Sequence, residues 1–424
     1  MVGALVPVFF TLLIFGLPIF ASLALSVAAI FYFVGGMDPL LVPMRMFSGM
    51  NNFSLMSIPF FILAAELMRI GGLSDRLINL ARALIGWLPG GLAAATVMAC
   101  LMFGSISGSS PATVIAIGSI LYPAMVKAGY DKYFAIGLIA TSGTLGPIVP
   151  PSIALIIYGS VTGTSVGALF AAGILPALLI GAILILYATI YSAWKGYPRD
   201  AMPTFGSIFT ALKQAAWGLG LPVILLGGIY SGVFTPTESA AAACLYGWFV
   251  GALVYRSISL RETLVVLRNT GLISGPLLLI TAGASVFSWL LASTGTPTDL
   301  ARYVLSSTEN PILVVAAFNL ILLVAGCFLD SASAIIILAP LMMPIAQELG
   351  VHPVHFGIIM LVNLSIGMLT PPVGLNLFVA MGVAKMSLGQ IFRAVIPTML
   401  LMVIALLCVS YIPQISMLVP DWLY

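Results

Sequence analysis

Two short clusters of polar residues interrupt apolar stretches in corresponding parts of the chain. Gly104–Pro111 contains four serines, and Gly326–Ser333 contains Asp330 with two serines. Such residues often cap the helix that follows, as Ser110 before Pro111 and Asp330 would do. An acid between two apolar segments of a membrane is costly, which favours a functional role for Asp330. The matched positions of the clusters also favour a shared function.

A second interruption follows each cluster. The stretches are SGTLGPIVPP at Ser142–Pro151 and SIGMLTPP at Ser365–Pro372. Proline removes a backbone donor, so glycine with paired prolines unwinds a helix and leaves carbonyls without helical partners. Within a bilayer these carbonyls must face protein, water or a cation. Hard cations prefer oxygen ligands, and Na⁺ is the cation we expect for a secondary carrier. A proline kink satisfied by neighbouring hydroxyls is the alternative.

The clusters and the breaks belong to one sequence element that occurs twice, at Gly104–Pro151 and at Gly326–Pro372. The register between the copies is nearly constant, so that Gly146 aligns with Gly367. Two interrupted apolar segments in corresponding halves of a membrane protein indicate a substrate and ion site between pseudo-symmetric repeats.

The composition identifies the elements that must position these residues. The chain has 424 residues, of which 61% are hydrophobic and 6% are charged, whereas a soluble domain has about 25% charged residues. The apolar runs are continuous rather than alternating, which predicts helices and excludes a barrel. We therefore expect an all-α polytopic membrane protein. The net charge of +3 gives no indication of nucleic-acid binding.

The order of segments predicts two repeats joined by a linker. Residues 1–200 form the first repeat, residues 201–216 the linker and residues 217–424 the second repeat. The first repeat is expected to hold an interface helix, a re-entrant hairpin and a broken helix, at 73–87, 89–127 and 132–160. The corresponding elements of the second repeat are expected at 297–307, 311–349 and 355–383. An amphipathic piece at 258–269 and an apolar segment at 272–293 are expected as separate elements.

Several polar residues outside the repeated element have simple structural interpretations. Glu66 lies three residues before Arg69, which predicts an ion pair, with contact to a partner subunit or an anchor at the membrane interface as the alternative. Thr235–Glu238 reads as a capping box with proline at the first helical position.

Three residues of the second half are harder to interpret. Asn363 either forms a hydrogen bond between helices or lines the substrate cavity. His352 and His355 flank a proline and are expected to be loop residues.

Four motifs in order resemble the large membrane subunit of tripartite ATP-independent periplasmic (TRAP) transporters. These motifs are GSISGSSPAT, GPIVPPS, GVFTPTESAA and GMLTPPVGLNLF, and the resemblance covers essentially the whole chain. The chain looks most similar to the sialic-acid branch of the family. P-loop and HExxH motifs are missing from the sequence, so we expect no enzyme and no direct use of ATP.

The resemblance implies the fold and the partners. It implies inverted-topology repeats, and an elevator motion that moves an organic acid across the bacterial cytoplasmic (inner) membrane with Na⁺ as the coupling ion. A small four-helix membrane subunit, as a separate chain, and a periplasmic substrate-binding protein are the implied partners. Sialic acid is the expected substrate, with a C4-dicarboxylate or another carboxylate as the alternative. A channel or a membrane-embedded assembly subunit is a more remote alternative.

The resemblance also implies site residues. One Na⁺ site would comprise Ser105, Ser107, Ser110, Gly143, Gly146 and Pro150. A second Na⁺ site would comprise Gly326, Phe328, Asp330, Gly367, Met368 and Thr370. The organic anion would lie between the tips, against Ser107, Ser109, Ser142, Asp330, Ser331 and Asn363. Half-helix N-termini and hydroxyls suit a carboxylate, and Asp330 would support Na⁺ or accept from substrate hydroxyls.

Overall fold

The fold is entirely helical in the part of the chain that the computed structural model describes, which is residues 2–34, 38–296, 299, 302, 303, 306 and 310–423. Over those residues, nine helices are long and apolar enough to cross a membrane, or up to ten if a bent pair counts as one span. Helices satisfy their own backbone hydrogen bonds, as a bilayer requires. The prediction of an all-α polytopic membrane protein is confirmed.

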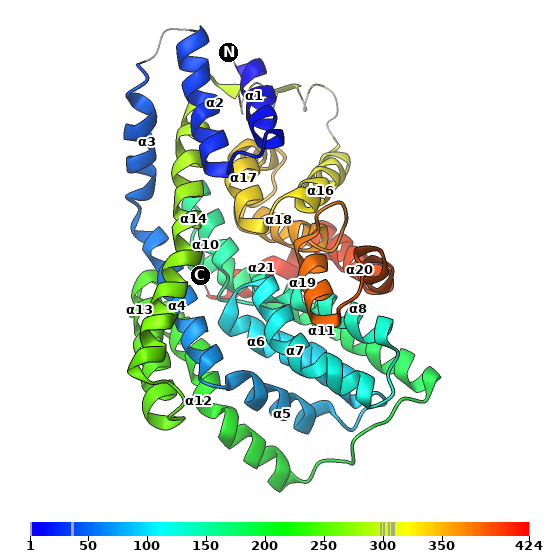
Figure 1. Ribbon diagram of the computed structural model, residues 1–424. Helices are drawn as coiled ribbons and strands as arrows, with labels where there is room; N and C mark the ends of the chain where they lie inside the picture. Colours follow the sequence, from blue (N-terminus) through cyan, green and yellow to red (C-terminus); the bar gives the residue numbers. More distant parts are fainter. Residues whose placement is uncertain are drawn as a thin grey trace.

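The helices form two groups, which we call the frame and the inner body (Figure 1). The frame consists of α1 (Val2–Ile14), α2 (Ile19–Val34), α3 (Leu41–Met50), the 3-10 turn η1 (Phe53–Met56), α4 (Ser57–Ile70), α12 (Phe205–Tyr230), α13 (Pro236–Phe249), the π-helical η2 (Val250–Val254) and α14 (Leu260–Ser293). Helix α5 (Leu73–Ile85) packs against both groups, on α6 and α12.

The inner body contains both copies of the repeated sequence element. Its helices are α6 (Gly91–Ser107), α7 (Ser110–Lys127), α8 (Lys132–Gly143), α9 (Leu145–Ile148), α10 (Ile153–Thr162), α11 (Val166–Lys195), α16 (Pro311–Phe328), α17 (Ser331–Glu348), α18 (Pro353–Gly367), α19 (Leu375–Ala384), α20 (Leu388–Tyr411) and α21 (Gln414–Leu423).

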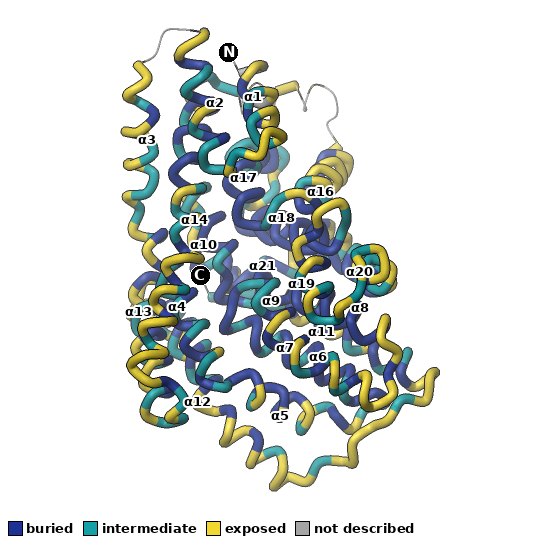
Figure 2. Tube along the Cα trace, viewed as in Figure 1, coloured by how far each residue is buried: buried dark blue, intermediate teal, exposed yellow. Residues whose placement is uncertain are grey.

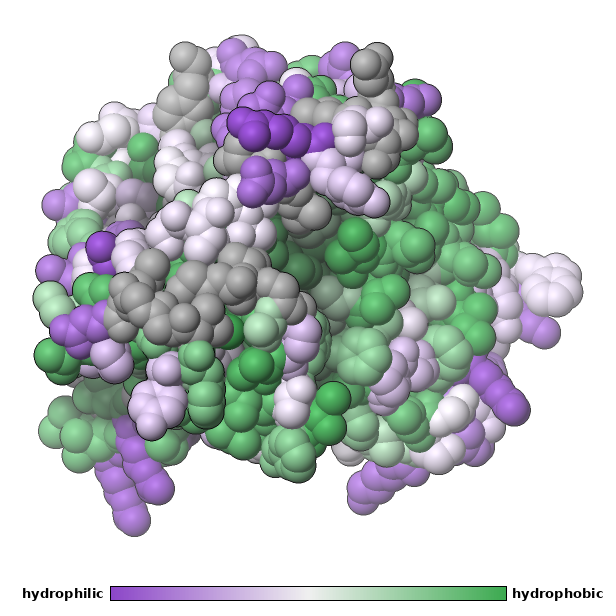
Figure 3. All heavy atoms as spheres, turned by 90° about the horizontal axis from the view of Figure 1, so that it is seen from above, coloured by the Kyte–Doolittle hydropathy of each residue, from purple (hydrophilic) through white to green (hydrophobic). Residues whose placement is uncertain are grey.

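Burial varies widely from helix to helix (Figure 2). In its most apolar window, α17 of the inner body is 61% buried, whereas α12 of the frame is 22% buried. Hydrophobic side chains cover much of the surface seen from above (Figure 3). An apolar outer surface of this extent suits contact with lipid or with another membrane protein.

The predicted hairpins and broken helices are present. Helices α6 and α7 form the first hairpin and α16 and α17 the second, while α8–α9–α10 and α18–α19 are the broken helices. Each break contains a cis peptide bond between its paired prolines. The re-entrant path of the hairpins and the inverted orientation of the repeats remain predictions.

A close glycine contact joins each hairpin to the break that follows it. A Cβ atom added to Gly104 would lie 3.0 Å from the Cα of Gly146, and one added to Gly326 would lie 2.9 Å from the Cα of Gly367. These pairs occupy equivalent positions of the two sequence copies. Only glycine allows the backbones to approach so closely.

Some element boundaries differ from the prediction. The pieces expected at 258–269 and 272–293 form one continuous helix, α14, which begins with a capping box of Ser259 and Glu262. Helix α12 starts at Phe205, where Thr204 caps it, so most of the expected linker at 201–216 is helical. The interface helix expected at 73–87 ends at Ile85. The interface helix expected at 297–307 lies largely outside the described residues.

Two local predictions have opposite outcomes. The capping box of Thr235 and Glu238 at the start of α13 is confirmed. The prediction that both histidines are loop residues is wrong for His355, which is buried in α18 with its Nδ1 2.6 Å from the Ser416 hydroxyl. His352 is the N-cap of the same helix. The apolar sequence that follows Pro353 forms the buried helix α18, and His355 is buried because it lies in that helix.

The glycine contacts generate a prediction about stability. In Gly367→Ala, the new Cβ would lie 2.5 Å from the Cα of Gly326, and overpacking of this kind costs roughly 1–3 kcal/mol. We expect the midpoint of thermal denaturation in detergent to fall by several degrees. Gly382→Ala is the control, because that helical glycine faces open space and alanine is the better helix former. Equal midpoints for the two variants would contradict the proposed role of the contact.

Candidate functional site

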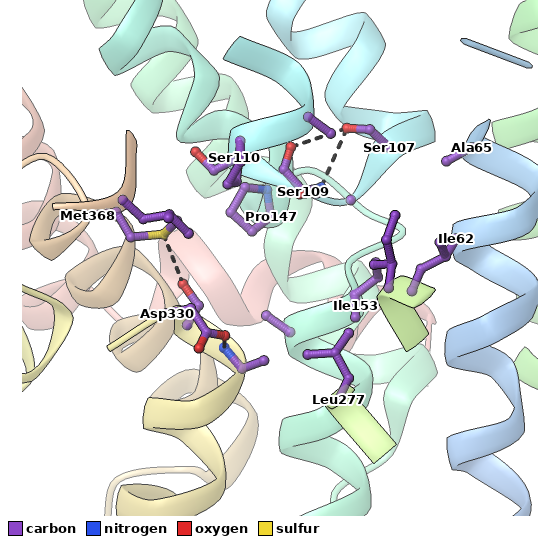
Figure 4. Close-up of a pocket in the computed structure, with 18 of the residues that line it drawn as sticks. Ile62, Ala65, Ser107, Ser109, Ser110, Pro147, Ile153, Leu277, Asp330 and Met368 are labelled. Carbon is purple, nitrogen blue, oxygen red and sulfur yellow. Dashed lines mark hydrogen bonds between the residues drawn. The ribbon is translucent and has the colours of Figure 1, made fainter. Parts of the chain in front are cut away.

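A cavity of about 210 Å³ lies where the two hairpin tips approach the frame (Figure 4). Helices α4 and α14 contribute to its wall on the frame side. Six residues expected at the ion and substrate sites line it: Ser107, Ser109, Ser110, Asp330, Ser331 and Met368. The structure therefore brings the two polar tips together around one space.

The first tip presents a cluster of oxygen atoms. The hydroxyls of Ser107 and Thr113 lie 2.9 Å apart, and the Thr113 hydroxyl donates to the carbonyl of Ser109 at 2.8 Å. Gly146 leaves room for this cluster, since a Cβ there would lie 2.6 Å from the Ser109 carbonyl oxygen. Sequence reasoning missed Thr113, whose signal is its position two residues after Pro111, on the first turn of α7.

At the second tip, Asp330 acts as the N-cap of α17. Its Oδ2 accepts from the backbone N–H groups of Ala332 at 3.0 Å and Ser333 at 3.2 Å, and the Ser333 hydroxyl donates to Oδ1. The Ser331 hydroxyl contacts the sulfur of Met368 at 3.4 Å. The capping interpretation of Asp330 is confirmed, and the residue also lines the cavity.

The two helix starts consequently differ in electrostatics. Ser109 is the N-cap of α7, and its side chain makes no capping hydrogen bond. The partial positive charge at the start of α7 is thus unneutralised by a cap, while the anionic Asp330 occupies the start of α17. The prediction that Ser110 caps α7 is wrong, because Ser110 is the first helical residue and its hydroxyl accepts from the side-chain amide of Asn376.

Asn376 connects the second sequence copy to the first tip. It lies in α19, after the second break, and its backbone N–H donates to the carbonyl of Met368 at 3.1 Å. Its side chain is fully buried and reaches Ser110. Sequence reasoning missed this residue, although it is a polar residue in the apolar stretch just after the paired prolines.

Other residues expected at the first Na⁺ site lie outside the lining of this cavity. The hydroxyl of Ser105 donates to the carbonyl of Met102 in its own helix at 2.7 Å. Gly143 packs against Val114, and Pro150 lies near Gly173. Gly146 is close to the oxygen cluster without lining the cavity.

At the second expected Na⁺ site, Gly326 and Gly367 form the close backbone contact. The Thr370 hydroxyl donates to the carbonyl of Ile366 at 3.3 Å, and Phe328 is 58% exposed. None of these four lines the cavity. The assignment of residues to the two Na⁺ sites therefore remains a prediction.

Two residues expected to contact the substrate are buried elsewhere in the inner body. Ser142 is fully buried in α8. Asn363 donates to the side chain of Asn319 at 2.8 Å, and Asn319 donates to Ser410 at 3.1 Å. This network joins α16, α18 and α20, so the interhelical interpretation of Asn363 is the one that the structure shows. Neither residue lines the cavity.

The donor atoms around the cavity suit a monovalent cation better than a transition metal. Hydroxyl, carbonyl and carboxylate oxygens predominate at the tips, and such ligands suit hard cations. The described residues contain no group of three or more histidine, cysteine, aspartate or glutamate side chains that could hold a metal ion.

The chain matches the family described as "Tripartite ATP-independent periplasmic transporter, DctM component" over residues 6–415. It belongs to this family. The TRAP permease is therefore a multi-pass protein of the bacterial inner membrane that serves organic anions, and it is not an enzyme.

Two curated relatives and one solved structure are similar to the chain over most of its length. The C4-dicarboxylate TRAP transporter large permease DctM of Pseudomonas aeruginosa is 44% identical over 89% of each chain. The sialic acid TRAP transporter large permease SiaM of Vibrio cholerae is 37% identical over 97% of this chain and 96% of its own. The YdaH transporter of Alcanivorax borkumensis shares the fold, with a TM-score of 0.62 at 16% identity over 91% of this chain and 89% of its own.

These identities correct the expected branch. The chain is more similar to the C4-dicarboxylate permease than to the sialic acid permease. Three of the four motifs that suggested the resemblance lie in or overlap the repeated sequence element, and the motifs indicate the family rather than the substrate.

The two roles of Asp330 generate a prediction. Asparagine also caps helices well, whereas alanine at an N-cap costs about 0.5–2 kcal/mol. We expect Asp330→Ala to lower the midpoint of thermal denaturation and Asp330→Asn to leave it near the wild-type value. Because Asp330 lines the cavity, Asp330→Asn should still reduce Na⁺-dependent uptake severalfold.

The control is Asp131, which caps α8 by accepting from Tyr133 and Phe134 at 3.0 and 2.9 Å and lies outside the cavity lining. Asp131→Asn should change neither stability nor uptake. Normal uptake by Asp330→Asn would contradict a role for its charge.

Proposed function

We propose that this permease imports a C4-dicarboxylate together with Na⁺, by an elevator movement of the inner body against the frame. A periplasmic binding protein delivers the substrate, and a small membrane subunit, encoded as a separate chain, completes the transporter. Membership in the TRAP family supports both partners. The higher identity to a C4-dicarboxylate permease than to a sialic acid permease supports the substrate class.

The observation that carries the proposal is the difference between the two helix starts at the cavity. The start of α7 lacks a side-chain cap and is flanked by the hydroxyls of Ser107 and Ser109. An uncapped helix N-terminus beside hydroxyl donors is a suitable place for a carboxylate. The start of α17 already holds the carboxylate of Asp330, so a substrate anion there would meet a like charge.

The size of the cavity also favours a small substrate. Pockets for drug-sized ligands are roughly 300–1,000 Å³, and this cavity is about 210 Å³. A four-carbon dianion fits such a volume more readily than a bulky sugar acid does.

One Na⁺ bound at each tip would offset the negative charge of the substrate. At the first tip, we propose that Na⁺ binds to the oxygen cluster of Ser107, Thr113 and the Ser109 carbonyl, beside Gly146. At the second tip, we propose that Na⁺ binds to Asp330 and to the backbone of the break at Gly367–Thr370. Two cations would neutralise a dianion, which lowers the cost of holding it in a medium of low dielectric constant.

The proposal is tested with the complete transporter reconstituted in proteoliposomes. We expect labelled succinate to accumulate when an inward Na⁺ gradient and the binding protein are both present, and to stop accumulating when K⁺ replaces Na⁺. Labelled sialic acid, offered with its own binding protein, serves as the alternative substrate. Uptake of sialic acid but not of succinate would overturn the substrate class, and uptake independent of Na⁺ would overturn the coupling.

The first tip provides a matched pair of variants. Ser107→Ala removes a hydroxyl at the cavity, and a net hydrogen bond of about 0.5–1.5 kcal/mol corresponds to a rise of roughly 2–10-fold in the succinate concentration for half-maximal uptake. Ser105→Ala removes a hydroxyl of the same helix that bonds to Met102 outside the cavity lining, and it should leave uptake unchanged. Equal effects of the two substitutions would argue against binding at this tip.

A further inference from the structure

A cationic side chain faces the same cavity from the frame. Arg69, on the last turn of α4, lines the cavity together with its neighbour Glu66. The predicted ion pair is present: Nη2 of Arg69 lies 2.7 Å from Oε2 of Glu66, and Nε lies 3.2 Å from both carboxylate oxygens. The tips supply hydroxyls and an acid to the cavity, and α4 supplies the guanidinium group of this ion pair.

The ion pair uses one edge of the guanidinium group. Nε and Nη2 face Glu66, while Nη1 has no hydrogen bond to any residue that the structure describes. The Arg69 side chain is 42% exposed and that of Glu66 is 16% exposed. Arginine has five donors in a rigid fork and can engage two carboxylates at once. Glu66 thus fixes the group on one edge and leaves the other edge available to a ligand.

We propose that Arg69 binds the second carboxylate of the dicarboxylate substrate, while the uncapped start of α7 binds the first. This inference rests on the proposed function and extends it to a residue that selects substrates with two negative charges. A dicarboxylate carries its charges at opposite ends, and Arg69 and the start of α7 line the same cavity from two different helices. Figure 4 shows the lining of the cavity, with Ile62 and Ala65 of α4 and Ser107 and Ser109 of the first tip. Glu66 acts as a positioning residue.

The competing interpretation is an ion pair that only braces the end of α4. Partly exposed pairs contribute about 0–1 kcal/mol to stability, and such a pair would have no preference between ligands. A measurement of ligand discrimination therefore separates the two interpretations, whereas a measurement of stability does not.

The test compares succinate with succinamate, its monoamide, which has nearly the same shape and one charge less. Binding is measured as Na⁺-dependent thermal stabilisation of the purified membrane complex without the binding protein, whose own preference would otherwise contribute. We expect the wild type to prefer succinate, and Arg69→Gln to reduce that preference about tenfold or more, as loss of a charge-assisted hydrogen bond predicts. Arg69→Lys keeps the charge but loses the fork, and it should retain part of the preference.

Arg82→Gln is the matched control. Arg82 forms a similar pair with Asp200, at 3.1 Å and with a side chain 46% exposed, outside the cavity lining. Its substitution should leave the preference at the wild-type value. An unchanged preference in Arg69→Gln, with the wild type binding succinate, overturns the role of Arg69 and leaves the substrate class intact. If the wild type prefers neither ligand or binds neither, the dicarboxylate assignment fails and this inference fails with it.

Discussion

The fold depends on how a broken helix can be held inside a bilayer. Unwound backbone leaves polar groups without helical partners, and lipid cannot satisfy them. This protein packs each break directly against a hairpin, with glycine on both sides of the contact: Gly104 against Gly146 and Gly326 against Gly367. The backbones approach closely enough to bury the break in protein. The polar tips and the cavity between them exist because both breaks are enclosed in this way.

The same enclosure produces a site whose two sides are chemically unequal. One helix start is capped by its own acid, Asp330, and the other has no side-chain cap. The duplicated sequence element therefore places two equivalent helix starts at one cavity, and a single residue difference leaves one start with a carboxylate cap and the other with no side-chain cap. The duplication explains why the two helix starts occupy similar positions, and the sequence difference between the copies explains why their caps differ.

The sequence predicts the architecture well because the architecture follows from hydropathy and from glycine and proline. The hairpins, the broken helices and the capping box of Thr235 and Glu238 all depend on local pattern. The predictions failed where the outcome depends on tertiary contacts. The continuous α14, the buried His355 and the partner of Ser110 are examples. Single-sequence patterns carry no information about which distant residue fills the space beside a given side chain.

The hydrogen bond from Asn376 to Ser110 has a mechanical consequence. It joins residues 266 positions apart, one in the first copy of the duplicated element and one in α19, just after the second copy, and both ends are buried. Any displacement that separated α7 from α19 would leave an amide and a hydroxyl unpaired in the interior, which is costly. The hydrogen bond therefore favours arrangements in which α7 and α19 stay in contact.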